Sequence, residues 1–309
     1  MESAVRRMKK ERLIEEIARL KKEKRAVILA HNYQPEEVQD IADFVGDSLE
    51  LSRKAAEVEE DIIVFCGVHF MAETAKILAP QKKVLIPDAK ARCPMADMVS
   101  GKDVRWMKEQ HPGKKVVAYV NTTAEVKAET YVCCTSANAV KVVNNLPDEE
   151  IIFVPDRNLA AYVSQKTGKR LHYWDGYCPI HEHIEVKDIK KMKKLHPQAE
   201  VWAHPECRPE VLALADRILS TGQMIREAPG SRAREIIVAT EVGILHRLRK
   251  ENTDKTFYPA REKAICKNMK RISLKKVYKT LVSEKPEVIV EAELAERARE
   301  ALNRMVQFV

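Results

Sequence analysis

Three cysteines recur along the chain at nearly equal steps: Cys93, Cys178 and Cys266 are separated by 85 residues (93 to 178) and 88 residues (178 to 266). Each follows a strand-like apolar segment. Three thiolates without a fourth suit a metal centre with one open position, and thiolates select zinc, copper(I) or iron–sulfur clusters. A [4Fe–4S] cluster held on three irons leaves the fourth iron open as a Lewis acid. The cysteines alone leave zinc and iron as alternatives.

The surroundings of these cysteines favour a metal role over simple packing. Proline follows directly in Cys93-Pro94 and Cys178-Pro179, as it does beside cysteine ligands of iron–sulfur proteins. No Cys-x-x-Cys pair is present, which disfavours a structural zinc knuckle. Free cysteine often packs as a small apolar residue, which we expect for the other four, Cys66, Cys133, Cys134 and Cys207. For the adjacent Cys133 and Cys134, a response to oxidation is the alternative.

Other polar residues repeat with the same step. His31, Asn121 and His204 come directly after apolar runs, at steps of 90 residues (31 to 121) and 83 residues (121 to 204). A hydroxyl series has steps of 88 and 85 residues and consists of Ser48, Ser136 and Thr221. Further apolar runs occupy 62–65, 151–154 and 236–239. A period of this length indicates three copies of one small domain.

The elements that must position these residues alternate between short apolar runs and amphipathic stretches such as 47–58 and 71–78. This is the βαβ pattern of a parallel sheet covered by helices. Ligands of such sheets bind beyond the carboxyl ends of the strands, where the histidines and cysteines lie. The sequence therefore predicts an α/β protein of three similar αβα sandwich domains, arranged around a pseudo-threefold axis that gathers the polar residues.

The predicted domain limits follow the repeats. We expect a first domain of residues 1–100 plus 271–309, a second of 101–185 and a third of 186–270. A helix is predicted over 3–24, with Val5, Leu13, Ile14, Ile17 and Leu20 toward the core. Two more helices are predicted over 273–282 and 291–308, packed back on the first domain. The polar segment 227–234 is predicted to be a mobile loop.

Composition limits the classes of function. The 309 residues carry a net charge of +8, but lysine and arginine alternate with glutamate, as on solvated helix faces. Aromatic residues make up 6%, few for base stacking, so we expect no nucleic-acid partner. No apolar run reaches the length of a membrane span and the start lacks a signal-peptide core, which predicts a cytoplasmic protein without a membrane partner. A positive protein with an inward polar pocket suits small acidic substrates.

Nine short motifs together resemble the quinolinate synthase family, the A protein of NAD biosynthesis. They follow one another in unbroken order between about residue 26 and residue 270. They are 30–34 (AHNYQ), 40–48 (DIADFVGDS), 93–96 (CPMA), 119–122 (YVNT), 135–139 (TSANA), 155–159 (PDRNL), 204–207 (HPEC), 220–224 (STGQM) and 240–243 (TEVG).

The resemblance implies a function and a set of site residues. Members of this family condense iminosuccinate (iminoaspartate) with dihydroxyacetone phosphate to give quinolinate, phosphate and water, with a [4Fe–4S] cluster on three cysteines, which match Cys93, Cys178 and Cys266. The functional link is to an aspartate oxidase or dehydrogenase that supplies iminosuccinate. Substrate-binding positions match His31, Ser48, Tyr119, Val120, Asn121, Ser136, His204, Pro205, Glu206, Ser220 and Thr221. Catalytic positions match Tyr33, Glu206, His31 and Tyr119.

Each role has a physical reason and a simpler alternative. Ser48, Ser136 and Thr221 precede amphipathic stretches, so they either cap helices or bind substrate anions at helix N-termini; the shared period favours binding. The histidines suit proton transfer or carboxylate recognition, with satisfied core histidines as the alternative. Glu206 is the expected general base or acid, or else a surface salt-bridge partner. The phenols of Tyr33 and Tyr119 stabilise a developing oxyanion, or simply pack.

Two other functions remain open for the cysteine set. An iron–sulfur redox carrier would use four protein ligands and would not need a pocket of histidines and hydroxyls. A zinc-dependent hydrolase or aldolase could use three thiolates, although catalytic zinc usually takes histidine or carboxylate ligands.

Overall fold

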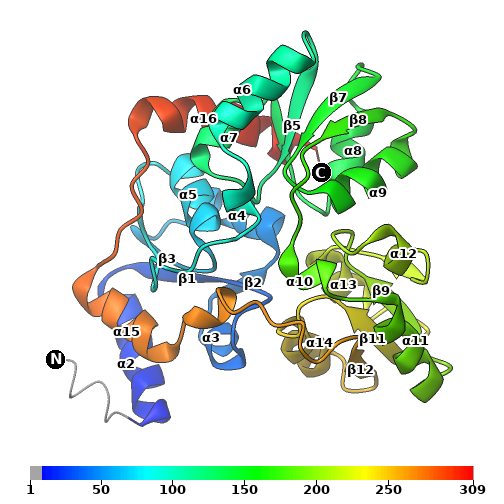
Figure 1. The fold of residues 1–309 in the computed structure, drawn as a ribbon. Helices are drawn as coiled ribbons and strands as arrows, with labels where there is room; N and C mark the ends of the chain where they lie inside the picture. The colour runs from blue at the N-terminus through cyan, green and yellow to red at the C-terminus, as the bar shows by residue number, and fades with distance from the viewer. Residues whose placement is uncertain (1–8, 309) are drawn as a thin grey trace.

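Three four-stranded parallel sheets of identical topology form the frame of the computed structural model, which describes residues 9–308 (Figure 1). In each sheet the first strand along the chain lies between the second and third, and the fourth pairs with the third. The strands are β1 (Ala26–His31), β2 (Phe44–Gly46), β3 (Ile62–Cys66) and β4 (Lys83–Leu85) in the first sheet; β5 (Lys115–Tyr119), β6 (Val132–Cys134), β7 (Glu150–Val154) and β8 (Arg170–Tyr173) in the second; β9 (Glu200–Ala203), β10 (Arg217–Ile218), β11 (Glu235–Ala239) and β12 (Thr256–Pro259) in the third. The predicted α/β class with three similar αβα units is confirmed.

The central strands are apolar except at their ends because both faces of each sheet are covered. All six residues of β1 are buried, and the predicted runs at 62–65, 151–154 and 236–239 form most of β3, β7 and β11. Burial of both faces is the rule for parallel sheets with helical crossovers. At the carboxyl ends of β1, β5 and β9 the buried apolar run consequently gives way to polar residues.

Helices connect successive strands. Those of the first unit are α3 (Glu36–Asp40), α4 (Ser48–Glu57) and α5 (His69–Leu78); those of the second are α6 (Gly101–Gln110), α7 (Ala124–Ala128), α8 (Ala139–Asn144), α9 (Arg157–Thr167) and α10 (Pro179–Glu182); those of the third are α11 (Val186–Leu195), α12 (Pro209–Leu212), α13 (Thr221–Glu227) and α14 (Ile244–Glu251). Two short 3₁₀ turns, η1 (Ala96–Met98) and η2 (Met269–Arg271), complete the set. The predicted stretches 47–58 and 71–78 correspond to α4 and α5.

The terminal helices differ in part from the sequence prediction. Helix α2 (Lys10–Glu23) buries Leu13, Ile17 and Leu20 as predicted, whereas Ile14 is exposed, because it lies beside this narrow stripe and outside the packed face. The predicted positions 3–8, Val5 included, lie outside the described residues.

The C-terminal helices α15 (Leu274–Ser283) and α16 (Ala292–Gln307) form where predicted. Helix α15 packs on α2 and β3, next to the first sheet, as expected. Helix α16 instead packs on α7 and β6 of the second unit as well as on α5 of the first, and Figure 1 shows it crossing between the two. Its buried stripe belongs to an apolar core that the first two units share. The exact domain limits stay a prediction.

The four non-periodic cysteines behave as predicted. Cys66, Cys133, Cys134 and Cys207 are fully buried, and burial raises the pKa of the Cys133 thiol to about 12. Such thiols are protonated near neutral pH, which favours packing over redox chemistry for the Cys133–Cys134 pair. Among the described helices, none combines the length and the hydropathy that a bilayer crossing requires.

Candidate functional site

The polar residues at the strand ends line one shared cavity. It brings together most residues predicted from the sequence, namely His31, Tyr33, Ser48, Cys93, Tyr119, Asn121, Ser136, Cys178, His204, Glu206, Thr221 and Cys266. Three further predicted residues, Val120, Pro205 and Ser220, are buried but are not among its lining residues. The described lining residues include no lysine or arginine, so histidines, hydroxyls and backbone N–H groups must provide any anion recognition here.

Two histidines at equivalent strand ends are oriented by the same backbone contact. The Tyr33 N–H donates to His31 Nδ1 at 3.1 Å, and the Glu206 N–H donates to His204 Nδ1 at 3.3 Å. Since Nδ1 accepts, a neutral ring carries its proton on Nε2. Burial lowers the pKa of both imidazoles to about 3 although the nearby Glu206 charge opposes it. Both rings are therefore neutral hydrogen-bond donors near pH 7.

The three periodic hydroxyls are not helix caps, which removes the simpler of the two alternatives. Asp47 caps α4, Ser220 caps α13, and α8 starts from Asn138, two residues beyond Ser136. Ser48 and Thr221 are the first residues inside their helices, one position after the cap. Ser136 Oγ lies 3.2 Å from His204 Nε2, and Thr221 Oγ1 accepts from Asn32 Nδ2 at 3.1 Å. All three hydroxyls border the cavity.

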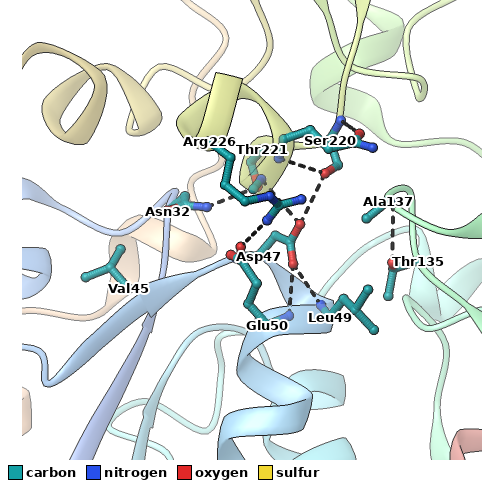
Figure 2. Close-up of polar contacts among 12 residues, drawn as sticks. Asn32, Val45, Asp47, Leu49, Glu50, Thr135, Ala137, Ser220, Thr221 and Arg226 are labelled. Atoms are coloured by element: carbon teal, nitrogen blue, oxygen red, sulfur yellow. Dashed lines mark hydrogen bonds and ion pairs between the residues drawn. The ribbon is translucent and has the colours of Figure 1, made fainter. Parts of the chain in front are cut away.

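One carboxylate joins the first and third units beside the cavity (Figure 2). Asp47 Oδ1 accepts from Leu49 N and Glu50 N at the start of α4, both at 3.0 Å. Asp47 Oδ2 accepts from Ser220 Oγ at 3.2 Å and from Gly222 N at 3.3 Å, at the start of α13. The two helix starts are thereby held together, and an ion pair between Arg226 and Glu50 closes the same contact.

A continuous chain of polar contacts runs from Glu206 to Tyr33. His181 Nδ1 lies 2.6 Å from Glu206 Oε2, and His181 Nε2 lies 2.8 Å from Thr240 Oγ1. Thr240 Oγ1 in turn lies 2.6 Å from the Tyr33 hydroxyl. Except for Tyr33, which is half-buried, these side chains are almost completely buried. The arrangement can move a proton between a carboxylate and a phenol without water.

The charge states along this chain follow from burial and proximity. Burial disfavours ionisation of Glu206, but His181, His204 and Tyr119 together outweigh that cost and lower the pKa of the carboxyl to about 2. Burial, reinforced by the Glu206 charge, raises the pKa of the Tyr33 and Tyr119 phenols well above the usual range. The Glu206 carboxylate is thus anionic and faces two protonated phenols.

Three polar atoms of residues that line the cavity have no hydrogen-bond partner in the described chain. Two are buried acceptors, Glu206 Oε1 and Asn121 Oδ1. The third is His181 Nδ1, whose 2.6 Å contact with Glu206 Oε2 does not have hydrogen-bond geometry. A buried acceptor without a partner costs roughly 1–3 kcal/mol, so the two acceptors indicate where donor groups of a ligand would bind.

His181 and Thr240 are the functional residues that the sequence prediction missed. His181 lies three residues after Cys178 in the short helix α10, and Thr240 follows β11 directly. The Thr240 motif resembled the family but suggested no role. A polar residue directly beyond a buried central strand was the signal for Thr240, whereas His181 belongs to no periodic series.

The periodic cysteines share a local structure that suits metal thiolates. Cys93 precedes η1, Cys178 is the N-cap of α10, and Cys266 precedes η2. Burial raises the pKa of all three thiols, and backbone N–H groups of each turn act in the opposite direction and lower it, those of Met95 and Ala96 at Cys93, of His181 at Cys178, and of Asn268 and Met269 at Cys266. Such donors stabilise a thiolate, although burial raises the pKa of the metal-free Cys93 thiol to about 12.

The sulfur positions discriminate between a single ion and a cluster. Among the described residues, only Cys178, His181 and Glu206 bring three ligand atoms within 4.8 Å of one another, and the three cysteines do not. A single zinc ion needs its ligands that close, whereas a cluster spreads three thiolates over three irons. Because His181 contacts both Glu206 and Thr240, we regard His181 and Glu206 as members of the proton chain and not as metal ligands.

Comparison with known proteins gives a consistent result. The family model described as "Quinolinate synthetase A protein" matches residues 15–307. The chain is 55% identical over 302 residues to the quinolinate synthase of Dehalococcoides mccartyi strain CBDB1, covering 98% of this chain and 100% of that protein. It is 53% identical over 294 residues to that of Methanoregula boonei (95% and 97% covered) and 52% identical over 299 residues to that of Thermodesulfovibrio yellowstonii (96% and 99% covered).

Proposed function

This chain belongs to the quinolinate synthetase A family, and on that premise we propose that it forms quinolinate from iminosuccinate and dihydroxyacetone phosphate, with loss of phosphate and water. The observation that carries the proposal is the convergence of three thiolates and the chain from Glu206 to Tyr33 on one cavity. Each of the three sheets contributes to that convergence, so it exists only in the assembled fold.

The cofactor assigned here is one [4Fe–4S] cluster held by Cys93, Cys178 and Cys266. The N–H donors in their turns and the spread of their sulfurs fit a cluster better than a single ion. When bound, the cluster supplies an open iron that polarises a substrate oxygen as a Lewis acid.

Substrate binding is assigned to neutral donors. His31 and His204 present Nε2–H groups, and Ser48, Ser136 and Thr221 present hydroxyls, at positions suited to carboxylate and phosphate oxygens. Hydrogen bonds to ionised acceptors are roughly twice as strong as neutral ones, which offsets the lack of a lysine or arginine in the lining. Asn121 completes this set, while Val120, Pro205 and Ser220 contribute only as neighbours that hold the lining segments.

Proton transfer is assigned to the chain that ends at Tyr33. The condensation joins the enamine carbon of iminosuccinate to the phosphate-bearing carbon of the triose, and phosphate leaves. A ketone must then become an aldehyde before the nitrogen closes the ring, which requires protons to move between neighbouring carbons. Glu206, anionic and adjacent to His181, accepts a proton, and the protonated Tyr33 donates one. Tyr119, protonated beside Glu206, stabilises developing negative charge.

Iminosuccinate hydrolyses readily, so an aspartate-oxidising enzyme has to supply it at the time of use. We assign that role to an aspartate oxidase or dehydrogenase, with the product directed to NAD biosynthesis.

The test is anaerobic purification with iron and sulfide analysis, followed by incubation with both substrates and detection of quinolinate by mass spectrometry. We expect about four irons and four sulfides per chain, and quinolinate that depends on both substrates. A chain that binds only zinc, or that makes no quinolinate with its cluster intact, overturns the proposal.

Two cysteine variants provide a matched comparison. Cys178→Ala should lose the cluster and nearly all turnover, because one of three ligands is gone. Cys66→Ala removes a fully buried thiol away from the cavity and should retain iron and turnover while lowering the stability. Equal iron content in both variants would contradict the ligand assignment.

A further inference from the structure

A buried acid stands two residues beyond the third strand in two of the three units. Strand β7 ends at Val154 and is followed by Asp156, and β11 ends at Ala239 and is followed by Glu241. Both side chains are fully buried. The equivalent position after β3 is Val68, so the first unit lacks the acid. The three units therefore differ at this position, because two of them have a buried acidic side chain and the first has an apolar one.

Each acid holds the cysteine of its own unit. Asp156 Oδ2 accepts from the Cys178 N–H at 3.2 Å, and Glu241 Oε1 accepts from the Cys266 N–H at 3.0 Å. The two contacts are equivalent in topology, because both join the end of a third strand to the ligand turn that follows the fourth. Cys93 has the same kind of turn but no acid behind it.

Glu241 differs from Asp156 because it also contacts a lysine, Lys270, which in turn binds the backbone of Tyr33. Lys270 Nζ lies 3.1 Å from Glu241 Oε2 and 2.5 Å from the Tyr33 backbone oxygen. Lys270 is itself tied to the cysteine turn, since its N–H donates to the Cys266 oxygen at 3.1 Å. Asp156 instead uses its other oxygen to cap α9 through the Leu159 N–H at 2.7 Å.

The packing around this contact leaves no room for a side chain at position 243. A Cβ added to Gly243 would lie 2.5 Å from Lys270 Nζ, 2.8 Å from Glu241 Oε2 and 2.9 Å from the Tyr33 carbonyl carbon. Separations below 3.0 Å force a neighbour to move. Glycine is the residue that permits Glu241, Lys270 and the Tyr33 backbone to meet.

We propose that Glu241 and Lys270 are positioning residues that couple the Cys266 turn to the backbone of Tyr33. The inference rests on the proposed function, in which Cys266 binds the cluster and Tyr33 moves protons. When the Cys266 turn is fixed by the cluster, Lys270 fixes the Tyr33 carbonyl, and the phenol is held against Thr240. When the turn is released, Tyr33 is released with it. The catalytic phenol is therefore in place only in a chain that has its cluster.

Hydrogen–deuterium exchange under anaerobic conditions tests this coupling, with the cluster present or removed by a chelator. In the unmodified chain, removal should speed exchange in 264–270 and also in 32–36, where Tyr33 N and Gln34 N are bonded to His31. In Lys270→Met, exchange in 32–36 should be fast even with the cluster bound, and its removal should add less than about twofold. Lys270→Arg should restore much of the response.

Two variants serve as controls. Asp156→Asn loosens a cluster ligand whose turn reaches Tyr33 only through the His181 and Thr240 side chains and not through the Tyr33 backbone. It should therefore speed iron loss to the chelator while the backbone of 32–36 stays protected as long as iron is bound. Lys267→Met changes an exposed lysine next to Cys266 and should match the unmodified chain in its exchange rates.

Steady-state kinetics provide a second readout. Lys270→Met should lower kcat by about tenfold or more with KM little changed, since a misplaced catalytic group costs that much.

The outcomes separate this inference from the proposed function. If the chain binds full iron and makes quinolinate, but 32–36 does not respond to cluster removal or Lys270→Met keeps the normal response, the coupling is wrong and the function stands. If iron and quinolinate are both absent in the unmodified chain, the proposed function fails on those two measurements, independently of the exchange data.

Discussion

The Glu206 carboxylate and the His181 imidazole lie 2.6 Å apart, Oε2 to Nδ1, and 3% and 1% of the two residues are exposed. A carboxylate so close to one nitrogen of a buried histidine fixes which nitrogen carries the proton and directs the other toward Thr240. His181 is therefore central to the site although it belongs to none of the repeated series.

Replacing His181 should abolish proton transfer without removing the cluster. We expect His181→Phe to lower kcat by about 100-fold or more, the range typical of a lost general acid or base, while KM changes little. Iron content and kcat should be measured on the same preparation. The exposed His183, two residues further, provides the control His183→Phe, which should keep kcat. A His181→Phe protein with normal kcat would show that the chain to Tyr33 is not used.

Adjacent hydroxyls at the start of α13 should respond differently to substitution. Ser220 caps the helix and bonds to Asp47, whereas Thr221 borders the cavity. Ser220→Ala should lower the free energy of unfolding by about 1 kcal/mol through loss of the cap. Thr221→Val should raise KM by about tenfold, as expected for one hydrogen bond to a charged substrate group. Thermal unfolding and steady-state kinetics on both variants decide this, and a reversed pattern contradicts the assignment.

Gly222 permits the close contact between the first and third units. A Cβ there would lie 2.5 Å from Asp47 Oδ2 and 2.9 Å from Glu50 Oε1. Gly222→Ala should therefore separate the two helix starts, lower the stability by about 1–3 kcal/mol as overpacking does, and raise KM. Gly230→Ala is the matched control, because its added Cβ meets only the Glu227 oxygen, at 3.9 Å. Equal unfolding midpoints for the two variants would contradict the role of Gly222.

Glu284 should make a pH-dependent contribution to stability. Hydrogen bonds from Lys24 and Lys83, both at 2.6 Å, lower the pKa of its carboxyl to about 2. The unfolded chain has a pKa of about 4.3, so this stabilisation is complete above that value and is lost as the pH falls toward 2. Because Glu284 and its two lysine partners are partly exposed, Glu284→Gln should lower the free energy of unfolding by at most about 1 kcal/mol. The cost should be constant above pH 5 and smaller at pH 3 in denaturant titrations; a cost that grows on acidification would refute this.

The repeats in the sequence predicted the sheets and most of the cavity because strand ends are where a buried apolar run must give way to polar residues. His31, Asn121 and His204 mark that transition in each unit. The cap positions could not be predicted in the same way. In Asp47-Ser48 and in Ser220-Thr221 both residues are of types that cap helices, so the sequence does not show at which of the two the helix starts. The start of the helix decides which of the two side chains is the cap and which borders the cavity.

The features missed by the sequence prediction depend on contacts between units. His181 gains its role from Glu206 and Thr240, which lie in other segments of the chain. The apolar stripe of helix α16 predicts that one face of the helix is buried, but it does not predict which elements that face contacts. The helix packs on α7 and β6 of the second unit as well as on the first unit. Pairings of this kind are set by the tertiary arrangement, and local periodicity contains no information about them.

The order of the three cysteines along the chain has a consequence for biosynthesis. A nascent chain folds from its N-terminal domain onward, and the first two units, with Cys93 and Cys178, are made well before Cys266 emerges from the ribosome. Helix α16, which packs on both of those units, is made after all three sheets. With the proposed ligands, complete cluster coordination therefore has to wait until the third sheet has been synthesised. Delivery of iron and sulfide then follows synthesis of the three units and does not accompany the folding of the first two.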